Sequence, residues 1–310
     1  MHNRAFLTLL TNTGYLPGVL VLHKSLVDVG SKYPLVVMAT PSLPQDARDV
    51  ITRRGITIRD IEPLHPKEGL HKLSPDDIRF SQTWTKLREF ELTEYERVVV
   101  LDSDMIIRKN IDDLMDMELP DDWIAAVHVC ACNPHQLRHY PPDWIRENCP
   151  FTAAEDNEEK APPAITDSSP RPYGLLNSGV VVLQPSEAVF TDIYNFLASP
   201  QVTHYTFPDQ DLLADYFKGR WKPLPWYYNG LKTLRDIHPK LWRDDEVSCV
   251  HYILSKKPWM SRLEDEKNPH YQELSRWWWE VYEKLRLEMS NVDTEGLALV
   301  ENSMALAKQS

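Results

Sequence analysis

Apolar and polar residues along the chain alternate in blocks that predict a doubly wound α/β fold. Near the N-terminus, short apolar runs typical of buried strands alternate with longer stretches whose apolar residues recur at helical spacing. The predicted strands cover residues 5–10, 35–39 and 56–61, and the predicted helices cover residues 15–26 and 45–53. Such alternation is typical of a mostly parallel central sheet flanked by helices.

The remainder of the chain continues this pattern, with one interruption. Further strands are predicted at 98–101, 180–183 and 247–253, and further helices at 83–92, 186–198, 212–217 and 270–287. Residues 132–172 are rich in proline and have little periodicity, so we expect an insertion or long loop that covers the site. We therefore expect a single domain over residues 1–290 and a weakly ordered tail over residues 291–310.

Two carboxylates follow the predicted strand that runs from Val98 to Leu101. If that strand stays extended, Asp102 and Asp104 project from the same face and can hold one hard cation together. Ligands in open α/β sheets bind outside the carboxyl ends of strands, which is where this pair lies. Acids after a strand are also common as solvated turn residues, so this motif alone leaves the function open.

Composition and charge exclude several classes of protein. The net charge of −12 argues against a nucleic-acid-binding protein, because phosphate backbones select for clustered Lys and Arg. No glycine-rich fingerprint follows the first predicted strand, which argues against a dinucleotide cofactor. No signal peptide and no apolar stretch of transmembrane length is visible, so the expectation is a cytoplasmic protein.

The cysteines have two interpretations. The chain has four, Cys130, Cys132, Cys149 and Cys249, too few for a disulfide-stapled secreted protein. His128 together with Cys130, Cys132 and Cys149 offers the ligand types of a zinc knuckle. The C-x-C spacing differs from the usual C-x-x-C, which favours buried free thiols instead.

Seven motifs, taken in order, resemble glycosyltransferase family 8, the glycogenin and galactinol synthase group, over roughly residues 5–259. They are T-L-L-T-N-T-G-Y, T-K-L-R-E-F, V-V-L-D-S-D, N-I-D-D-L, L-N-S-G-V-V-V-L-Q-P-S, D-Q-D-L-L and H-Y-I-L-S-K-K-P-W. The resemblance implies a GT-A fold, Rossmann-like, over residues 1–290. It further implies a uridine diphosphate (UDP) sugar as donor and transfer with retention of anomeric configuration.

The resemblance also assigns roles by position. Uridine contacts are implied for Leu9, Thr11, Asn12 and Tyr15. Asp102, Asp104 and His251 are implied as Mn²⁺ ligands, which suits two carboxylates and an imidazole, with Ser103 beside them. Contacts to the donor sugar are implied for Lys86, Asn177, Ser178, Asp209 and Gln210, with Arg79 as a further candidate. The catalytic candidates are Asp209 and Gln210, nearest the reacting carbon, and Lys257, which would neutralise the diphosphate leaving group.

Two departures from glycogenin-like sequences concern the diphosphate loop and the acceptor side. Leu254 stands where those sequences carry glycine, which puts the role of its backbone amide in binding the diphosphate in doubt. Residues 132–172 are absent from those sequences, and the C-terminal R-W-W-W-E-V-Y resembles the K-W-W-D-I-Y end of galactinol synthases. The insertion and the C-terminal motif favour a small-molecule or polyol acceptor, and a homodimer is a further hypothesis.

Three alternatives remain beside this hypothesis. One is a glycogenin-like glucosyltransferase that acts on a protein or a glucan. Another is a haloacid-dehalogenase-type phosphatase, because an apolar strand ending in D-x-D is also the nucleophile motif of that family. The third is a non-catalytic protein that binds a nucleotide sugar.

Overall fold

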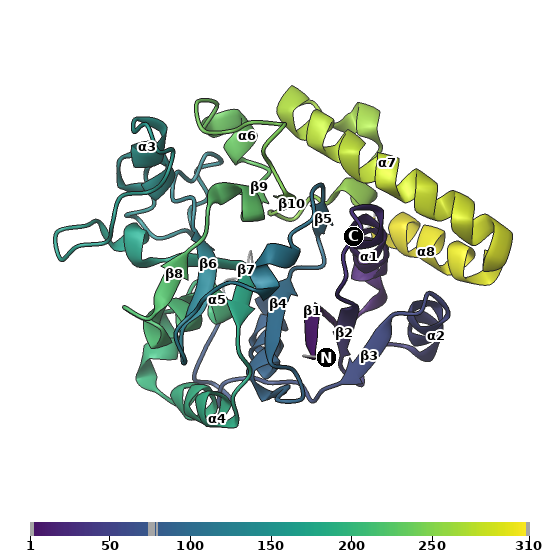
Figure 1. Cartoon of the computed structure of the whole chain (residues 1–310), viewed down its shortest axis with the longest axis horizontal. Helices are drawn as coiled ribbons and strands as arrows, with labels where there is room; N and C mark the ends of the chain where they lie inside the picture. The colour runs from purple at the N-terminus through teal and green to yellow at the C-terminus, as the bar shows by residue number, and fades with distance from the viewer. Residues whose placement is uncertain (1–2, 74–77, 79, 308–310) are drawn as a thin grey trace.

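The computed structural model describes residues 3–73, 78 and 80–307, and a mostly parallel sheet lies at its centre (Figure 1). Within these ranges the sheet has seven strands in the order β3-β2-β1-β4-β7-β6-β8. Their bounds are β1 Arg4–Leu10, β2 Leu35–Ala39, β3 Thr57–Asp60, β4 Arg97–Leu101, β6 Ile124–His128, β7 Leu176–Leu183 and β8 Trp221–Pro223. Neighbouring strands run parallel except at β7, which is antiparallel to both β4 and β6. This architecture confirms the predicted fold class.

Helices surround the sheet, and many of the connections are short 3₁₀ turns. The α-helices are α1 Leu16–Asp28, α2 Gln45–Arg53, α3 Pro150–Glu155, α4 Glu187–Phe196, α5 Pro208–Tyr216, α6 Leu234–Ile237, α7 Pro269–Val292 and α8 Thr294–Ala307. The 3₁₀ helices are η1 Thr13–Tyr15, η3 Thr83–Glu91, η4 Asp112–Met115, η5 Arg146–Asn148, η6 Arg171–Gly174, η7 Pro200–His204, η8 Trp226–Asn229, η9 Pro258–Met260 and η10 Leu263–Asp265. The helix expected at residues 83–92 is thus the 3₁₀ helix η3.

The reversed direction of β7 places its first residues beside the end of β4. Leu101 of β4 pairs with Val180 of β7, and the amide of Asp102 donates to the carbonyl of Gly179 at 2.9 Å. In a fully parallel sheet, the start of one strand would lie at the opposite edge from the end of its neighbour. The antiparallel strand therefore brings Asn177 and Ser178 next to Asp102.

A small second sheet places the strand Cys249–His251 beside the Asp-x-Asp motif. Its described strands lie in the order β5-β10-β9, with β5 Met105–Ile107, β9 Gly230–Leu231 and β10 Cys249–His251. His251 pairs with Met105, the residue directly after Asp104. A residue near the end of the chain therefore lies beside the Asp-x-Asp motif through main-chain pairing alone.

The C-terminal residues form a helix where the sequence had suggested a weakly ordered tail. Helix α8 covers most of residues 291–310, and Figure 1 shows it with α7 along the flank of the molecule next to α1. Leu297, Val300 and Met304 recur at helical spacing, and the last two are buried. This apolar stripe was overlooked, and its packing explains why the segment is ordered.

None of the helices in the described ranges combines the length and the hydropathy that a bilayer crossing requires.

Candidate active site

A cavity of about 450 Å³ opens at the carboxyl ends of β1 and β4. All the site residues predicted from the sequence line it, apart from Arg79, which lies outside the described residues. They are Leu9, Thr11, Asn12, Tyr15, Lys86, Asp102, Ser103, Asp104, Asn177, Ser178, Asp209, Gln210, His251 and Lys257. The cavity has the size of a typical small-molecule site.

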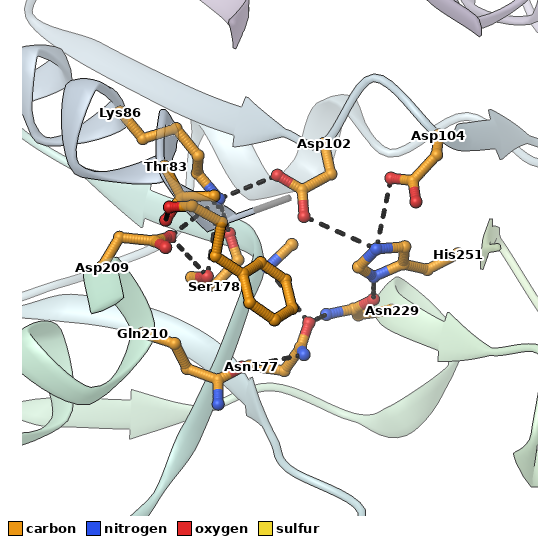
Figure 2. Close-up of polar contacts among 12 residues, drawn as sticks. Thr83, Lys86, Asp102, Asp104, Asn177, Ser178, Asp209, Gln210, Asn229 and His251 are labelled. Atoms are coloured by element: carbon orange, nitrogen blue, oxygen red, sulfur yellow. Dashed lines mark hydrogen bonds and ion pairs between the residues drawn. The ribbon is translucent and has the colours of Figure 1, made fainter. Parts of the chain in front are cut away.

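The two acids of the motif lie in a turn and not on an extended strand. Strand β4 ends at Leu101, and β5 begins at Met105. The turn is held on both sides, because Asp102 N–H donates to the Gly179 carbonyl and Tyr252 N–H donates to the Asp104 carbonyl, each at 2.9 Å. The condition for the same-face geometry, an extended strand, is therefore not met, although both carboxylates still point into one space (Figure 2).

The imidazole of His251 completes a possible set of metal ligands with these acids. Its Nε2 atom lies 3.5 Å from Oδ2 of Asp102 and 3.3 Å from Oδ1 of Asp104. One ligand atom from each of the three residues lies within 4.8 Å of the others. Two carboxylate oxygens and one imidazole nitrogen suit a divalent ion such as Mn²⁺, so the residues present fit the ion that the resemblance implies.

A chain of amide side chains fixes the orientation of His251 (Figure 2). Its Nδ1 atom lies 2.9 Å from Oδ1 of Asn229, which is fully buried. Asn229 Nδ2 donates to Asn177 Oδ1 at 2.7 Å, and Asn177 Nδ2 donates to Gln210 Oε1 at 3.0 Å. Because Nδ1 is used by the amide oxygen, Nε2 faces the carboxylates. Asn229 was missed in the sequence, because a lone Asn after W-Y-Y gives no signal of its own.

Gly179 lies directly against the ring of His251. A Cβ atom added at Gly179 would come within 2.4 Å of Cε1 and Nδ1 of His251. The missing side chain therefore makes room for the imidazole.

Lys86 is the positive centre of a cluster of polar groups in the cavity. Its ammonium donates to Oδ1 of Asp102 and to the carbonyl of Ser178, both at 2.8 Å, and lies 3.3 Å from Oδ2 of Asp209. Burial alone would lower the pKa of Lys86, but the nearby carboxylates of Asp102 and Asp209 outweigh it and raise the pKa. Lys86 is therefore a cation that links Asp102 to Asp209.

Lys257 forms a second buried ion pair, with Asp104. Its ammonium donates to Oδ2 of Asp104 and to the carbonyl of Tyr252. Burial opposes ionisation of Asp104, yet the charges of Lys257 and His251 hold its pKa well below the usual range. Asp104 is thus an anion at neutral pH, ready to bind a cation.

The two acids at the start of α5 have separate roles. Asp211 accepts hydrogen bonds from the amides of Thr206 and Phe207, as expected for a residue that stabilises a helix start. Burial raises its pKa to about 6. Asp209 instead points into the cavity, where it accepts a hydrogen bond from Ser178 Oγ at 2.8 Å. The helix-start explanation therefore accounts for Asp211 but not for Asp209.

Glu89 interacts electrostatically with Lys86, Asp209 and Asp102, and it was not predicted as a site residue. Its side chain is fully buried on η3, and both carboxyl oxygens have no hydrogen-bond partner among the described residues. Desolvation raises its pKa to about 8 although the charge of Lys86 works in the opposite direction. Glu89 is therefore mostly protonated at neutral pH.

Residues 132–172 form one wall of the cavity. Asn133, Pro134, His135, Leu137, Tyr140 and Trp144 line it from this segment. Trp144 stacks on Phe207 with ring centroids 5.0 Å apart, and Tyr140 meets the same ring edge-on. The insertion therefore contributes an aromatic surface to the cavity.

Leu254 lies at the cavity with a backbone conformation that glycine usually adopts. Its φ angle is +75°, in the left-handed region that L-residues seldom occupy. The backbone shape that a glycine would allow at this position is thus present without the glycine.

Comparisons with known proteins identify the family of the chain. The family model for glycosyl transferase family 8 matches residues 6–262. Galactinol synthase 1 of Solanum lycopersicum is 33% identical over 92% of this chain and 83% of its own length. Galactinol synthase 6 of Arabidopsis thaliana is 31% identical over 99% of this chain and 89% of its own length.

Solved structures agree in fold. A galactosyltransferase, LgtC, solved with donor and acceptor sugar analogues, has a TM-score of 0.60 at 16% identity and covers 90% of this chain and 95% of its own. The bifunctional glycosyltransferase WbbM has a TM-score of 0.63 at 15% identity and covers 100% of this chain and 52% of its own. These matches give no support to the phosphatase alternative. The chain belongs to glycosyltransferase family 8 and is a hexosyltransferase.

Proposed function

We propose that the protein is a metal-dependent, retaining hexosyltransferase that moves a hexose from a UDP-sugar to a hydroxyl of a small-molecule or polyol acceptor. The observation that carries this proposal is the convergence of Asp102, Asp104 and His251 on one point of the cavity. These residues would hold Mn²⁺ or a similar ion, which neutralises charge on a sugar diphosphate when bound.

The nucleotide would lie at the carboxyl end of β1. Leu9, Thr11, Asn12 and Tyr15 line that part of the cavity. Asn12 Oδ1 accepts from the amide of Gly14, and Trp259 Nε1 donates to the Gly14 carbonyl, each at 3.0 Å. This turn is therefore held from both sides, which would preorganise it for the uracil and ribose.

Lys257 would stabilise the diphosphate as it leaves. Its ammonium lies beside Asp104, so it is already at the metal side of the cavity. A fixed cation in a largely water-excluded site lowers the free energy of a developing negative charge more than a mobile one in solvent. Because its position is held by the Tyr252 carbonyl as well, little reorganisation is needed during the reaction.

Asp209 and Gln210 would lie nearest the reacting carbon, and Lys86, Asn177 and Ser178 would contact the hydroxyls of the donor sugar. Lys86 and Ser178 hold the Asp209 carboxylate, while Asn177 holds the amide of Gln210. Each polar group that faces the sugar is therefore fixed by another residue before the ligand arrives.

The acceptor would bind against the wall formed by residues 132–172. Six residues of that segment line the cavity, and the space they take up favours a small acceptor over a glucan or protein. The names of the relatives, galactinol synthases, agree with a small polyol product. Arg79 stays a candidate contact to the donor.

A transfer assay tests this function. Purified protein with Mn²⁺ is offered UDP-galactose, UDP-glucose or UDP-N-acetylglucosamine together with cyclic polyols, glucans or no acceptor. We expect glycosylated polyol, formed with the anomeric configuration of the donor as read by NMR. Transfer only to glucan or to the protein itself would favour the glycogenin-like alternative. Donor binding without transfer or hydrolysis would favour the non-catalytic one.

Variants localise the activity. Asp102→Asn and His251→Ala should each abolish transfer, because each removes a metal ligand. The matched control is Asp121→Asn, an exposed acid in the turn before β6, which should leave the rate unchanged. Full activity in both ligand variants would contradict the proposal.

A further inference from the structure

A second cluster of metal-binding side chains lies beside the cavity and has no part in the proposed transfer. Cys130 and Cys132 follow β6, Cys149 precedes α3, and His238 follows α6. One ligand atom from each of the four lies within 4.8 Å of the others. Three segments that are far apart in the sequence therefore bring three thiols and one imidazole to a single point.

Four of the six edges between these atoms are close to those of a coordination tetrahedron. Nε2 of His238 lies 3.2, 3.7 and 3.8 Å from the sulfurs of Cys132, Cys130 and Cys149, and the sulfurs of Cys130 and Cys149 lie 3.9 Å apart. A tetrahedral zinc with Zn–S bonds of about 2.3 Å and a Zn–N bond of about 2.0 Å requires edges of about 3.8 Å between sulfurs and about 3.5 Å from sulfur to nitrogen. The sulfurs are too far apart for a disulfide, and the cysteines are free.

A carboxylate lies on the far side of the histidine. Nδ1 of His238 lies 3.0 Å from Oε2 of Glu155, at ion-pair distance but without the alignment of a hydrogen bond, and both residues are buried. Glu155 is in turn held by the guanidinium of Arg146 at 2.9 Å. Ligating histidines usually direct their second ring nitrogen at a carboxylate, which fixes the ring and raises its basicity.

We propose that Cys130, Cys132, Cys149 and His238 bind one structural Zn²⁺ ion. Thiolate ligands select zinc over the oxygen-seeking ion proposed for Asp102, Asp104 and His251, and four protein ligands leave no open position for chemistry. The sequence pointed to His128 as the histidine of such a site. His128 instead packs edge-on against Trp221, with centroids 4.9 Å apart, and His238 takes the place.

The site has a structural consequence for the cavity. Cys132 and Cys149 bracket residues 133–148, which include the cavity-lining residues from Asn133 to Trp144. An ion bound by both cysteines would fasten the two ends of this segment to each other and to the end of α6. Zinc would thus hold the acceptor wall in place without touching the acceptor.

Metal analysis of the full chain tests the inference independently of the proposed function. Protein purified without a metal-affinity tag is desalted, and its zinc, iron and manganese contents are measured by mass spectrometry. We expect about one tightly held zinc ion per chain. Cys149→Ser and His238→Ala should lose most of it. Cys249→Ser, which changes another buried free thiol, and Asp102→Asn should both keep it.

Cobalt substitution keeps the test decisive if the ligand variants fail to fold. Wild-type protein stripped of zinc and loaded with Co²⁺ should show thiolate-to-cobalt charge-transfer absorption and the visible bands of a tetrahedral ion. The inference would be overturned if protein from cells grown with ample zinc contains no zinc and shows no such bands with Co²⁺. Iron in place of zinc, or zinc retained by a folded Cys149→Ser variant, would overturn it as well.

Discussion

Oδ1 of Asn229 lies 2.9 Å from Nδ1 of His251, and this contact decides which nitrogen of the imidazole faces Asp102 and Asp104. Asn229 is fully buried and is not among the residues that line the cavity, so we assign it a positioning role. Its effect on the reaction would come through the orientation of His251.

Replacing Asn229 by leucine should therefore weaken metal binding without removing a ligand. Leucine has a similar size but no acceptor, so the imidazole loses its fixed orientation. We expect a loss of about 10- to 100-fold in Mn²⁺ affinity, measured by titration, with a similar loss in kcat/KM. Circular dichroism checks that the variant is folded. Unchanged Mn²⁺ affinity in a folded variant would show that Asn229 serves stability alone.

Gly179→Ala should displace the imidazole of His251. The added methyl group would lie 2.4 Å from the His251 ring, so the ring or the strand must move. We expect a loss of about 1–3 kcal/mol in the free energy of unfolding together with loss of Mn²⁺ binding. Denaturant unfolding and metal titration measure the two effects.

Gly174→Ala is the matched control for that variant. A Cβ atom at Gly174 meets nothing within 4 Å, and the residue lies just before the same strand. Its free energy of unfolding should stay within about 0.5 kcal/mol of the parent. If both alanine variants behave alike, steric contact with His251 is not the reason for glycine at position 179.

Removal of the Lys86 charge should cost both stability and activity. Lys86→Met leaves the buried carboxylate of Asp209 without its cation, which should lower the free energy of unfolding by about 3 kcal/mol. The double variant Lys86→Met/Asp209→Asn should regain much of that stability but not the transfer rate. Recovery of transfer in the double variant would contradict a direct role for these two residues at the donor sugar.

Glu89 predicts a pH dependence of stability. Its folded-state pKa of about 8 lies above the ordinary value of 4.5. Between these values the unfolded chain releases the proton and the folded chain keeps it. The stability that this group contributes is therefore greatest below the lower value and is lost as the pH rises towards the upper one.

Glu89→Gln should remove this dependence. Relative to the parent, its free energy of unfolding should rise between about pH 5 and about pH 8, by up to about 1.4 kcal/mol per pH unit. Denaturant unfolding at several pH values without added metal measures it. Glu91→Gln, an exposed neighbour, is the control. Parallel curves for parent and Glu89→Gln would mean that Glu89 is ionised in the folded protein.

The alternation of apolar runs was enough to predict the mostly parallel sheet, and ordered motifs were enough to name fourteen of the residues that line the cavity. Long-range contacts were beyond the sequence. The reversal of β7, the turn that carries Asp102 and Asp104, and the approach of Asn229 to His251 depend on strand order, which local patterns do not encode. His238 lies 89 residues from Cys149, so spacing could not reveal that it completes the cysteine cluster.

Helix α8 was mispredicted as a weakly ordered tail for a different reason. Its apolar residues do recur at helical spacing, but the proximity of the chain end favoured an interpretation as a loose tail. Burial of Val300 and Met304 supplies the stabilisation that makes the helix ordered.

The central claim is that Asp102, Asp104 and His251 hold one divalent ion that binds the diphosphate of the donor. Calorimetric titration of UDP into metal-free and Mn²⁺-loaded protein tests it most directly, because the ion and the nucleotide must then strengthen each other's binding. We predict at least about tenfold tighter UDP binding with Mn²⁺ in the parent and no such gain in a folded His251→Ala variant. Equal UDP affinity with and without Mn²⁺ in the parent, or the same gain in His251→Ala, would contradict the claim.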